Sequence, residues 1–285
     1  MKVAVIILNY NSSDDCRKCI SYLKRQENVE TEIIMVDNCS QVDDLAKLRY
    51  IATEQKCTLI ENKENKGYNA GNNIGLRYAA SKGYRYALIA NPDMEFPQTG
   101  YLQCLVAKME GDEDVVVCAS DIISPDGVHQ NPLQRDGDWH GSFAWLTDLL
   151  KQKKGSDTLG DWIDSPHESH YCAKVSGCCL MVRLDFIQQI GFFDKNVFLY
   201  VEEAILSRQV ERAGRKMYYT AETTAVHAHV KSEKGDPVRR FKAWRDSRIY
   251  FIKHYSGDGW MGRQISILSI KMYTWMLILA KTIRK

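Results

Sequence analysis

Acidic side chains lie at two places in this 285-residue chain where they are suited to bind a metal ion or to accept a proton. Asp93 and Glu95 directly follow a short apolar run, and Glu202 and Glu203 lie far downstream, before His227. Carboxylates bind hard divalent cations, imidazole can complete the shell of such a cation, and a second carboxylate can act as a base. Together with the nucleotide-binding α/β domain that the N-terminal part predicts, these residues point to an enzyme that breaks a bond to a nucleotide diphosphate.

The first hundred residues contain the elements that must position these groups. Short β-branched and apolar runs predict strands, and the segments between them carry helix-capping residues and helical periodicity. The predicted strands are residues 3–8, 32–36, 57–60 and 86–90, and the predicted helices are 12–23, 42–55 and 72–81. This alternation predicts an α/β fold, with a mostly parallel sheet of Rossmann type and helices on both faces.

Polar side chains follow each of the predicted strands. They are Asn9, Asp37, Asn65 and Asp93. Ligands of open α/β sheets bind at the carboxyl ends of the strands, so the four positions converge on one edge of the sheet. The sequence therefore predicts a nucleotide-binding domain with its site at that edge.

The second half of the chain is less regular. Residues 132–170 are rich in Asp, Gly, Trp and His and predict a long excursion, which is either a loop on the acceptor side or a decorated surface, with a short helix near 143–150. Regular structure is expected again at 175–182, 184–190 and 202–213, followed by extended segments at 216–219 and 223–226. We expect a domain over 1–235, divided into a nucleotide-binding half (1–97) and an acceptor-binding half (98–235), and an extension over 236–285.

At this point the chain resembles the glycosyltransferase family 2 proteins of GT-A fold, most closely their rhamnosyltransferase-like bacterial branch. The resemblance extends from Val3 to about His229 and depends on seven segments in a fixed order. They are residues 5–11 (VIILNYN), 34–40 (IMVDNCS), 64–75 (ENKGYNAGNNIG), 91–93 (NPD), 175–177 (VSG), 191–194 (GFFD) and 198–203 (FLYVEE). Each segment is weak alone, but their order and spacing together are specific.

The resemblance implies a binding site for a nucleotide sugar, linked to dTDP or UDP. Asn9 and Asn11 would lie along the nucleotide, and Asp37 would hydrogen-bond the pyrimidine base or the ribose. Asn65, Gly67 and Asn72 would form the floor under the base and the diphosphate, where glycine permits close approach of the backbone.

The resemblance also implies a metal site for Mn2+ or Mg2+. Asp93 would match the metal-binding aspartate of the family's Asp-x-Asp motif, and His227 would match the late metal ligand. Asn91 stands where many relatives have the first Asp of that motif, so one ligand of the usual set is neutral in this chain.

Glu203 would match the catalytic base, which is usually Asp in the family, and the adjacent Glu202 is its rival. Adjacent carboxylates raise each other's pKa, which suits a base. The structural alternative is a helix N-terminus, where acidic residues are favoured by the helix dipole. Many relatives have a further acid two positions later, but this chain has Ile205.

The implied reaction is an inverting, metal-dependent transfer of a sugar, with rhamnose expected, to a hydroxyl of a glycan or lipid-linked acceptor in cell-surface polysaccharide synthesis. A nucleotidyltransferase is one alternative, but it usually needs a Gly-rich first loop with a basic residue, and the loop here is Asn9-Tyr10-Asn11-Ser12-Ser13. A non-catalytic relative that binds a nucleotide sugar is the other alternative.

The bulk properties suggest where the protein works. A net charge of +2 gives no support for nucleic-acid binding, and nine cysteines without a leading signal segment predict a reduced, cytoplasmic protein. The extension is basic and aromatic, and its last helix, expected over 265–283, has a charge-free run too short to span a bilayer. We expect this helix to lie on the inner face of the cytoplasmic membrane. The alternative is packing on the domain or on a homodimer partner.

Overall fold

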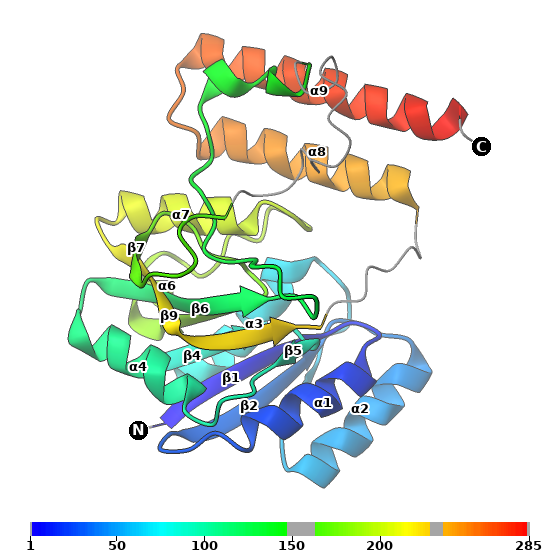
Figure 1. The fold of residues 1–285 in the computed structure, drawn as a ribbon. Helices are drawn as coiled ribbons and strands as arrows, with labels where there is room; N and C mark the ends of the chain where they lie inside the picture. Colours follow the sequence, from blue (N-terminus) through cyan, green and yellow to red (C-terminus); the bar gives the residue numbers. More distant parts are fainter. Residues whose placement is uncertain (1, 147–162, 229–235, 284–285) are drawn as a thin grey trace.

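The computed structural model describes residues 2–146, 163–228 and 236–283, and it places a mixed sheet between helices, with a helical hairpin above one end (Figure 1). The strands are β1 (Lys2–Asn9), β2 (Glu30–Asp37), β3 (Thr58–Glu61), β4 (Tyr86–Ala90), β5 (Met94–Glu95), β6 (Val115–Ile123), β7 (His170–Cys172), β8 (Cys179–Arg183) and β9 (Lys216–His227). The helices are α1 (Ser13–Leu23), α2 (Val42–Gln55), α3 (Tyr68–Ser81), α4 (Tyr101–Gly111), α6 (Leu184–Gln189), α7 (Glu202–Arg212), α8 (Pro237–His254) and α9 (Trp260–Ile283), with a 3-10 turn, η1, at Trp139–Gly141.

The strand order is β3-β2-β1-β4-β8-β6-β9-β5, and β7 pairs with β9. Strands β1 to β4 are mutually parallel, as the alternation of strands and helices predicted. Strand β8 enters between β4 and β6 and is antiparallel to both, and β5 is antiparallel to β9. The predicted α/β fold with helices on both faces is confirmed, and the antiparallel strands make its second half mixed.

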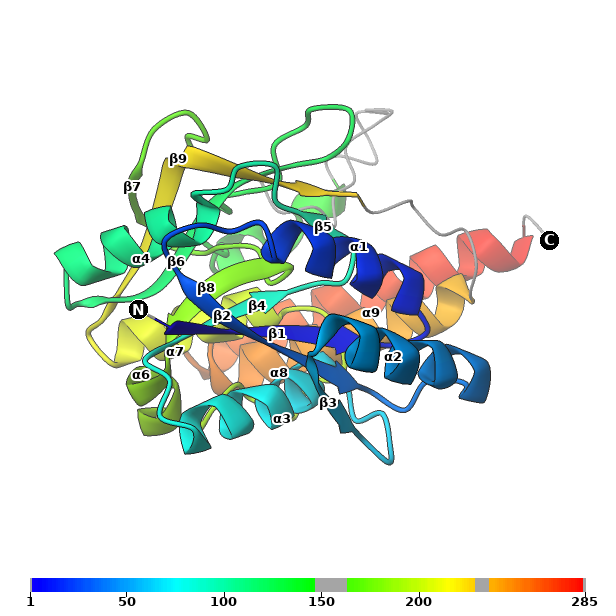
Figure 2. The ribbon, with the colours of Figure 1, turned by 90° about the horizontal axis from the view of Figure 1, so that it is seen from below.

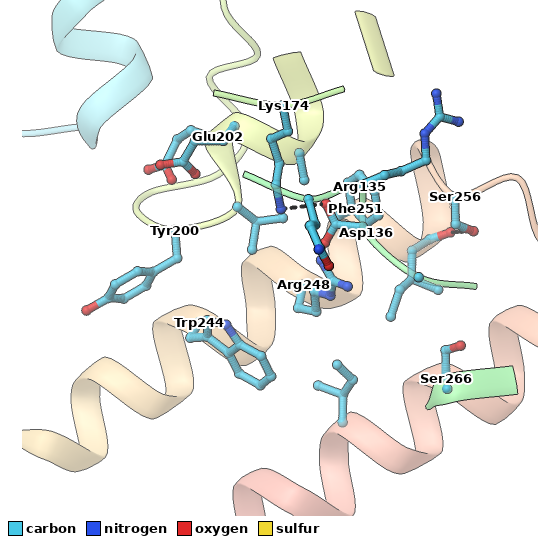
Figure 3. A pocket seen from close by; sticks show the side chains of 18 of the residues that line it. Arg135, Asp136, Lys174, Tyr200, Glu202, Trp244, Arg248, Phe251, Ser256 and Ser266 are labelled. Carbon is cyan, nitrogen blue, oxygen red and sulfur yellow. Dashed lines mark hydrogen bonds and ion pairs between the residues drawn. The ribbon is translucent and has the colours of Figure 1, made fainter. Parts of the chain in front are cut away.

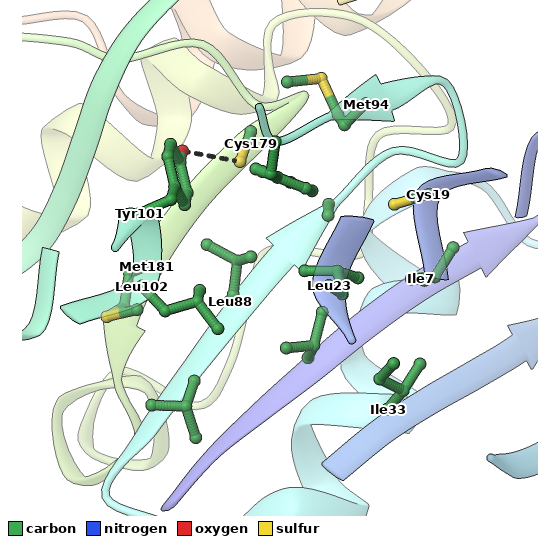
Figure 4. Packing of buried hydrophobic residues seen from close by; sticks show 14 of the residues in the cluster. Ile7, Cys19, Leu23, Ile33, Leu88, Met94, Tyr101, Leu102, Cys179 and Met181 are labelled. Carbon is green, nitrogen blue, oxygen red and sulfur yellow. Dashed lines mark hydrogen bonds between the residues drawn. The ribbon is translucent and has the colours of Figure 1, made fainter. Parts of the chain in front are cut away.

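Alternate residues of β1 belong to the two hydrophobic clusters on opposite faces of the sheet. Val3, Val5 and Ile7 pack with α1, α2 and α4, whereas Ala4 and Ile6 pack with α3, α6 and α7. All five are fully buried. Figure 2 shows helices on either side of the sheet, and Figure 4 shows the packing on the first face. A strand buried on both faces needs apolar residues at every position, which explains its unbroken apolar run.

The C-terminal extension is an antiparallel hairpin of α8 and α9 that packs on α7 and on the loop before it. Ser247 donates a hydrogen bond to the Leu199 carbonyl at 2.7 Å. The hydroxyls of Tyr250 and Tyr255 both donate to Asp194 Oδ2, at 2.9 and 2.7 Å. Ile205 of α7 is fully buried in the cluster that joins it to the hairpin. The position where many relatives have an acid is therefore a core position here.

Several predicted boundaries differ from the structure. Helix α3 begins at Tyr68, four residues before the predicted start, and β8 begins at Cys179, so residues 175–178 are not strand. The two predicted extended segments are one strand, β9, and α9 begins at Trp260, five residues early. Most of the short helix predicted near 143–150, His229 and the predicted domain boundary at 235 lie outside the described residues.

Candidate active site

The carboxyl ends of β1 and β2 are joined by a buried polar network. Asn9 Nδ2 donates to Asp37 Oδ1 at 3.0 Å and to Asp44 Oδ2 at 2.8 Å. The backbone N–H of Ser40 donates to the other Asp37 oxygen at 3.1 Å. Asn9 and Asp37 are almost completely buried. The structure brings these two predicted residues together, and both Asp37 oxygens accept hydrogen bonds from within the protein.

A second set of contacts holds the loops around this network. Asn11 Oδ1 accepts a hydrogen bond from the Gln41 N–H at 2.8 Å. Asn65 Oδ1 accepts from Asn38 Nδ2 at 3.1 Å and from the Gly67 N–H at 3.0 Å. The loops after β1, β2 and β3 are thus connected by side-chain amides, so the predicted nucleotide side of the site is a preorganised unit.

Gly67 and Asn72 have neighbours that the sequence did not predict. Gly67 has φ +105°, and a Cβ there would lie 2.3 Å from the carbonyl oxygen of Phe198. The missing side chain of Gly67 lets the backbone of Phe198 approach closely. This approach brings the Phe198 carbonyl within 2.9 Å of the Tyr68 N–H, which donates a hydrogen bond to it. Asn72 is fully buried, and its Oδ1 has no hydrogen-bond partner among the described residues. Their proposed places under a nucleotide stay predictions.

The two predicted metal ligands lie side by side. Asp93 Oδ1 is 3.3 Å from His227 Nε2, because β5 pairs with β9 and Met94 lies opposite His227. His227 Nδ1 is 2.8 Å from Gln130 Oε1. If Nδ1 carries the proton that Gln130 accepts, then Nε2 presents its lone pair toward Asp93. Within the described residues no group of three or more His, Cys, Asp or Glu side chains is placed to hold a metal ion.

Asn91 connects this pair to the next wall of the site. Asn91 Oδ1 accepts a hydrogen bond from the Tyr68 hydroxyl at 2.8 Å, and the same hydroxyl is 2.8 Å from the Gly177 carbonyl. The Asn91 N–H donates to the Cys178 carbonyl at 2.8 Å. Burial raises the pKa of Tyr68, so this hydroxyl stays protonated as a donor. Asn91 is therefore held in place through both its amide oxygen and its backbone N–H.

The N-terminus of α7 carries the two glutamates. Glu203 Oε1 accepts a hydrogen bond from the Gly177 N–H at 3.2 Å. Glu202 is buried, and its Oε1 has no hydrogen-bond partner among the described residues. Burial, followed by the charge of Glu203, raises the pKa of Glu202 to about 8. The preceding residues Tyr200 and Val201 have φ of +73° and +71°. This region is strained for a β-branched residue, and such strain is common at functional sites.

A cavity of about 880 Å³ joins this end of the sheet to the helical hairpin. Asn91, His227, Glu202 and Glu203 line one side. The opposite side is formed by the hairpin, and Figure 3 shows Trp244 and Arg248 facing it from α8. The other predicted residues are not among its lining residues; they are Asn9, Asn11, Asp37, Asn65, Gly67, Asn72 and Asp93.

An ion-paired cluster lies in the wall between the two sides. Asp136 Oδ2 is 3.1 Å from Lys174 Nζ, and Asp136 Oδ1 pairs with Arg248 of α8 (Figure 3). Burial opposes ionisation of Asp136, but the charges of Arg248 and Lys174 outweigh it and lower the pKa of this carboxyl. The cluster fastens the hairpin to the segment around residue 136.

Sequence reasoning missed Tyr68, Gln130 and this cluster. Tyr68 belongs to the Gly-rich motif, and its position one residue after Gly67 was a usable signal. Gln130 had none, since it reaches His227 across 97 residues. Asp136 and Lys174 fall in or near the irregular stretch, where no periodicity indicates which side chains are buried.

Comparison with known proteins decides the family. The family model described as Glycosyl transferase family 2 matches residues 4–176, more than half of the chain. The chain belongs to glycosyl transferase family 2. This glycosyltransferase is 23% identical over 282 residues to the low-salt glycan biosynthesis hexosyltransferase Agl10 of Haloferax volcanii, covering 97% of this chain and 83% of that protein. It is 29% identical over 86 residues to an N-acetylglucosaminyl-diphospho-decaprenol L-rhamnosyltransferase of Mycobacterium tuberculosis, covering 30% of this chain and 28% of that one.

Solved structures confirm the GT-A fold of the glycosyltransferase. The mannosyltransferase PcManGT from Pyrobaculum calidifontis, in complex with GDP-Man and Mn2+, superposes with a TM-score of 0.60 at 15% identity, covering 95% of this chain and 69% of that one. GalNAc-T7 with UDP, GalNAc and Mn2+ superposes with a TM-score of 0.61 at 15% identity, covering 94% of this chain and 54% of that one. At this identity the likeness concerns the fold alone.

Proposed function

We propose that this glycosyltransferase moves a sugar from a nucleotide diphosphate to a hydroxyl of a glycan or lipid-linked acceptor, with inversion of the anomeric centre. The observation that carries the proposal is the cavity itself. It has a metal-ligand candidate, His227, and two carboxylates, Glu202 and Glu203, in one wall, and a separate helical wall opposite. A donor and an acceptor can therefore approach each other from different sides.

The donor proposal is a sugar linked to dTDP or UDP, with rhamnose as the sugar. Support comes from the partial similarity to a rhamnosyltransferase and from nucleotide-sugar complexes of proteins with the same fold. The preorganised network around Asn9, Asp37 and Asn65 lies at the carboxyl ends of parallel strands, where ligands of such sheets bind. These three residues would position the nucleotide, chiefly through the loops they hold.

The residues present fit a divalent cation. Asp93 and His227 supply one carboxylate oxygen and one imidazole nitrogen, a pair suited to Mn2+ and less typical of Mg2+. Gln130 orients the imidazole from behind, as the partners of metal-bound histidines usually do. When bound, the cation would neutralise negative charge on the departing diphosphate.

Of the two glutamates, we propose Glu203 as the base. A group with a pKa of about 8 holds its proton at neutral pH, so Glu202 is a poor proton acceptor there. Glu203 carries the charge that contributes to this rise, and the Gly177 N–H orients its carboxylate. Glu203 would remove the proton of the acceptor hydroxyl as its oxygen attacks the anomeric carbon. The nucleotide diphosphate leaves from the opposite face, and a single displacement of this kind inverts the centre.

Two isosteric variants test the assignment. Glu203→Gln should lower kcat by about 100-fold or more, as expected when a general base is lost, with nucleotide affinity nearly unchanged. Glu202→Gln imitates the protonated form and should lose less than about tenfold at neutral pH. The reverse order would transfer the role to Glu202. Thermal shifts with Mn2+ and UDP, dTDP, GDP or CDP identify the donor class, because a ligand of the native state raises the Tm.

Family membership sets aside the nucleotidyltransferase alternative. The missing acid at Ile205 does not favour the non-catalytic alternative, because the Ile205 side chain packs in the cluster that joins α7 to the hairpin. The anomeric configuration of the product, measured by NMR, tests inversion directly. A product with the donor's configuration would contradict the single-displacement mechanism.

A further inference from the structure

Helix α9 exposes large apolar side chains, whereas its buried face mixes apolar residues, Ile267 and Tyr273, with small polar ones. Its inner face, packed on the protein, includes buried Ser266, Ser269 and Thr274. Ser266 Oγ is 2.8 Å from Ser142 Oγ, and Trp145 Nε1 donates to Ser269 Oγ at 2.8 Å. A surface helix of a soluble domain normally directs its apolar stripe inward and its polar residues outward.

The outward face of α9 carries large apolar side chains. We call this set the α9 stripe: Met261, Leu268, Met272, Trp275 and Leu279, whose exposed fractions are 70, 55, 44, 67 and 41%. At about 100° per residue these five positions fall within a stripe about 60° wide. Trp260, 75% exposed, lies at the start of the helix. An apolar stripe of this kind on an otherwise folded helix indicates a partner surface.

The charge of the hairpin identifies the chemistry of that partner. Residues 237–285 contain eleven Lys or Arg against two Asp, a net charge of +9, whereas the whole chain carries only +2. Helix α9 itself has no Asp or Glu. A second copy of the chain would place one strongly basic hairpin against another across a two-fold axis, which charge repulsion disfavours. An anionic lipid surface supplies both the apolar layer and the negative charge.

We propose that the α9 stripe docks in the interface of an anionic membrane, with the helix axis parallel to the bilayer. By length and composition alone, residues Trp260–Thr282 could cross a membrane, so the short charge-free run does not by itself exclude spanning. The packing argues against spanning instead. Gly262 lies so close to Trp139 that a Cβ would meet its ring at 2.6 Å, and the serines of the inner face bond to the same segment. Insertion across a bilayer would break these contacts.

The docking has a consequence for the reaction, and this part rests on the proposed function. The inner side of the same hairpin lines the 880 Å³ cavity through Trp244, Arg248 and Tyr273. A protein held by the α9 stripe would therefore present its acceptor cavity beside the lipid headgroups. An acceptor carried on a lipid would reach Glu203 without leaving the membrane.

Vesicle flotation of the full chain tests the proposal. We expect flotation with phosphatidylcholine vesicles that contain phosphatidylglycerol, weaker binding to phosphatidylcholine alone, and a loss of binding at high salt. Trp275→Ser should lower the partition coefficient by about tenfold or more, the cost of removing one large apolar side chain from the interface. Tyr50→Ser is the matched control, because Tyr50 is 63% exposed on α2, away from the hairpin, and should not change binding.

Equal flotation of Trp275→Ser and the unaltered chain would overturn the proposal. It would also be overturned if the chain failed to float and Trp275→Ser converted a dimer to a monomer in light scattering, since the stripe would then bind a second copy. Thermal shifts with nucleotide and transfer to a soluble acceptor should be unchanged in Trp275→Ser. These two readouts separate failure of the membrane proposal from failure of the proposed function.

Discussion

The buried carboxyl of Glu202 should make the stability of this glycosyltransferase depend on pH in a direction opposite to that of most acidic residues. Burial and the adjacent Glu203 raise its pKa from 4.5 to about 8. Between these values the folded protein holds a proton that the unfolded chain has released. The free energy of unfolding therefore falls as pH rises, by up to ~1.4 kcal/mol for each pH unit, and this loss levels off above pH 8.

The variant Glu202→Gln removes this titration. From well below pH 4.5 to well above pH 8 the total change amounts to ~5 kcal/mol, and the variant should gain ~3–4 kcal/mol of this relative to the unaltered chain between pH 5 and pH 8. The buried amide needs a hydrogen-bond acceptor, but that cost is the same at every pH and cancels when the two pH curves are compared. Urea denaturation followed by tryptophan fluorescence, repeated from pH 5 to pH 9, measures both curves.

Glu203→Gln is the control. It removes only the second cause of the raised pKa, so the total fall in stability should become smaller and should level off at a lower pH. Burial remains, so the fall should not disappear. If the curves of Glu202→Gln and the unaltered protein run parallel from pH 5 to pH 9, then Glu202 is not protonated in the folded state at neutral pH. The assignment of Glu203 as the base would lose its main support.

Three further predictions concern the geometry of the site. Gln130→Leu should weaken Mn2+ binding by about 10- to 100-fold, measured by EPR in the presence of UDP. Gln130→Glu keeps an acceptor for His227 and should bind Mn2+ nearly normally, and equal Mn2+ affinities of the two variants would exclude the orienting role. Gly177→Ala places a Cβ 3.0 Å from Glu203 Oε1, so kcat should fall severalfold with a small change in Tm, while Gly111→Ala, which meets nothing within 4 Å, should leave kcat unchanged. Ile205→Asp introduces the acid that is common in relatives and buries its charge in an apolar cluster. It should destabilise the protein by about 3 kcal/mol or more, measured by urea denaturation. A variant as stable as the unaltered protein would show that this cluster does not hold the hairpin.

Local patterns were sufficient to predict the fold from β1 to β4. Strand β4 and helix α2 have the predicted bounds, because an apolar run and a helical pattern each depend on residues that are neighbours in the sequence. Strand β6 went unrecognised, and the insertion of β8 between β4 and β6 could not be predicted either. That pairing joins Ala87 to Val182, and no local signal specifies a partner so distant in the sequence.

The candidate site, like the fold, was predicted only in part from the sequence. Asp93 and His227 were predicted from the family motif, and the structure brings them within 3.3 Å. The motif does not include the groups that hold these side chains in place. They are Gln130, which contacts His227, and the Gly177 N–H, which orients Glu203. These contacts join residues that are 97 and 26 positions apart in the sequence, so they become visible only in the folded chain.

Ile205 shows how one substitution can connect the site to the surface of the protein. An acid two residues after the base would point to the region where α8 and α9 now pack, and a buried charge there would require a partner. With isoleucine, the same position contributes to the cluster that includes Phe251 and Ile267, and the hairpin becomes a wall of the cavity. The position of that wall relative to Glu203 is then fixed. Acceptor selection in this glycosyltransferase should therefore depend on residues of the C-terminal hairpin that lie outside the segment matched by the family model.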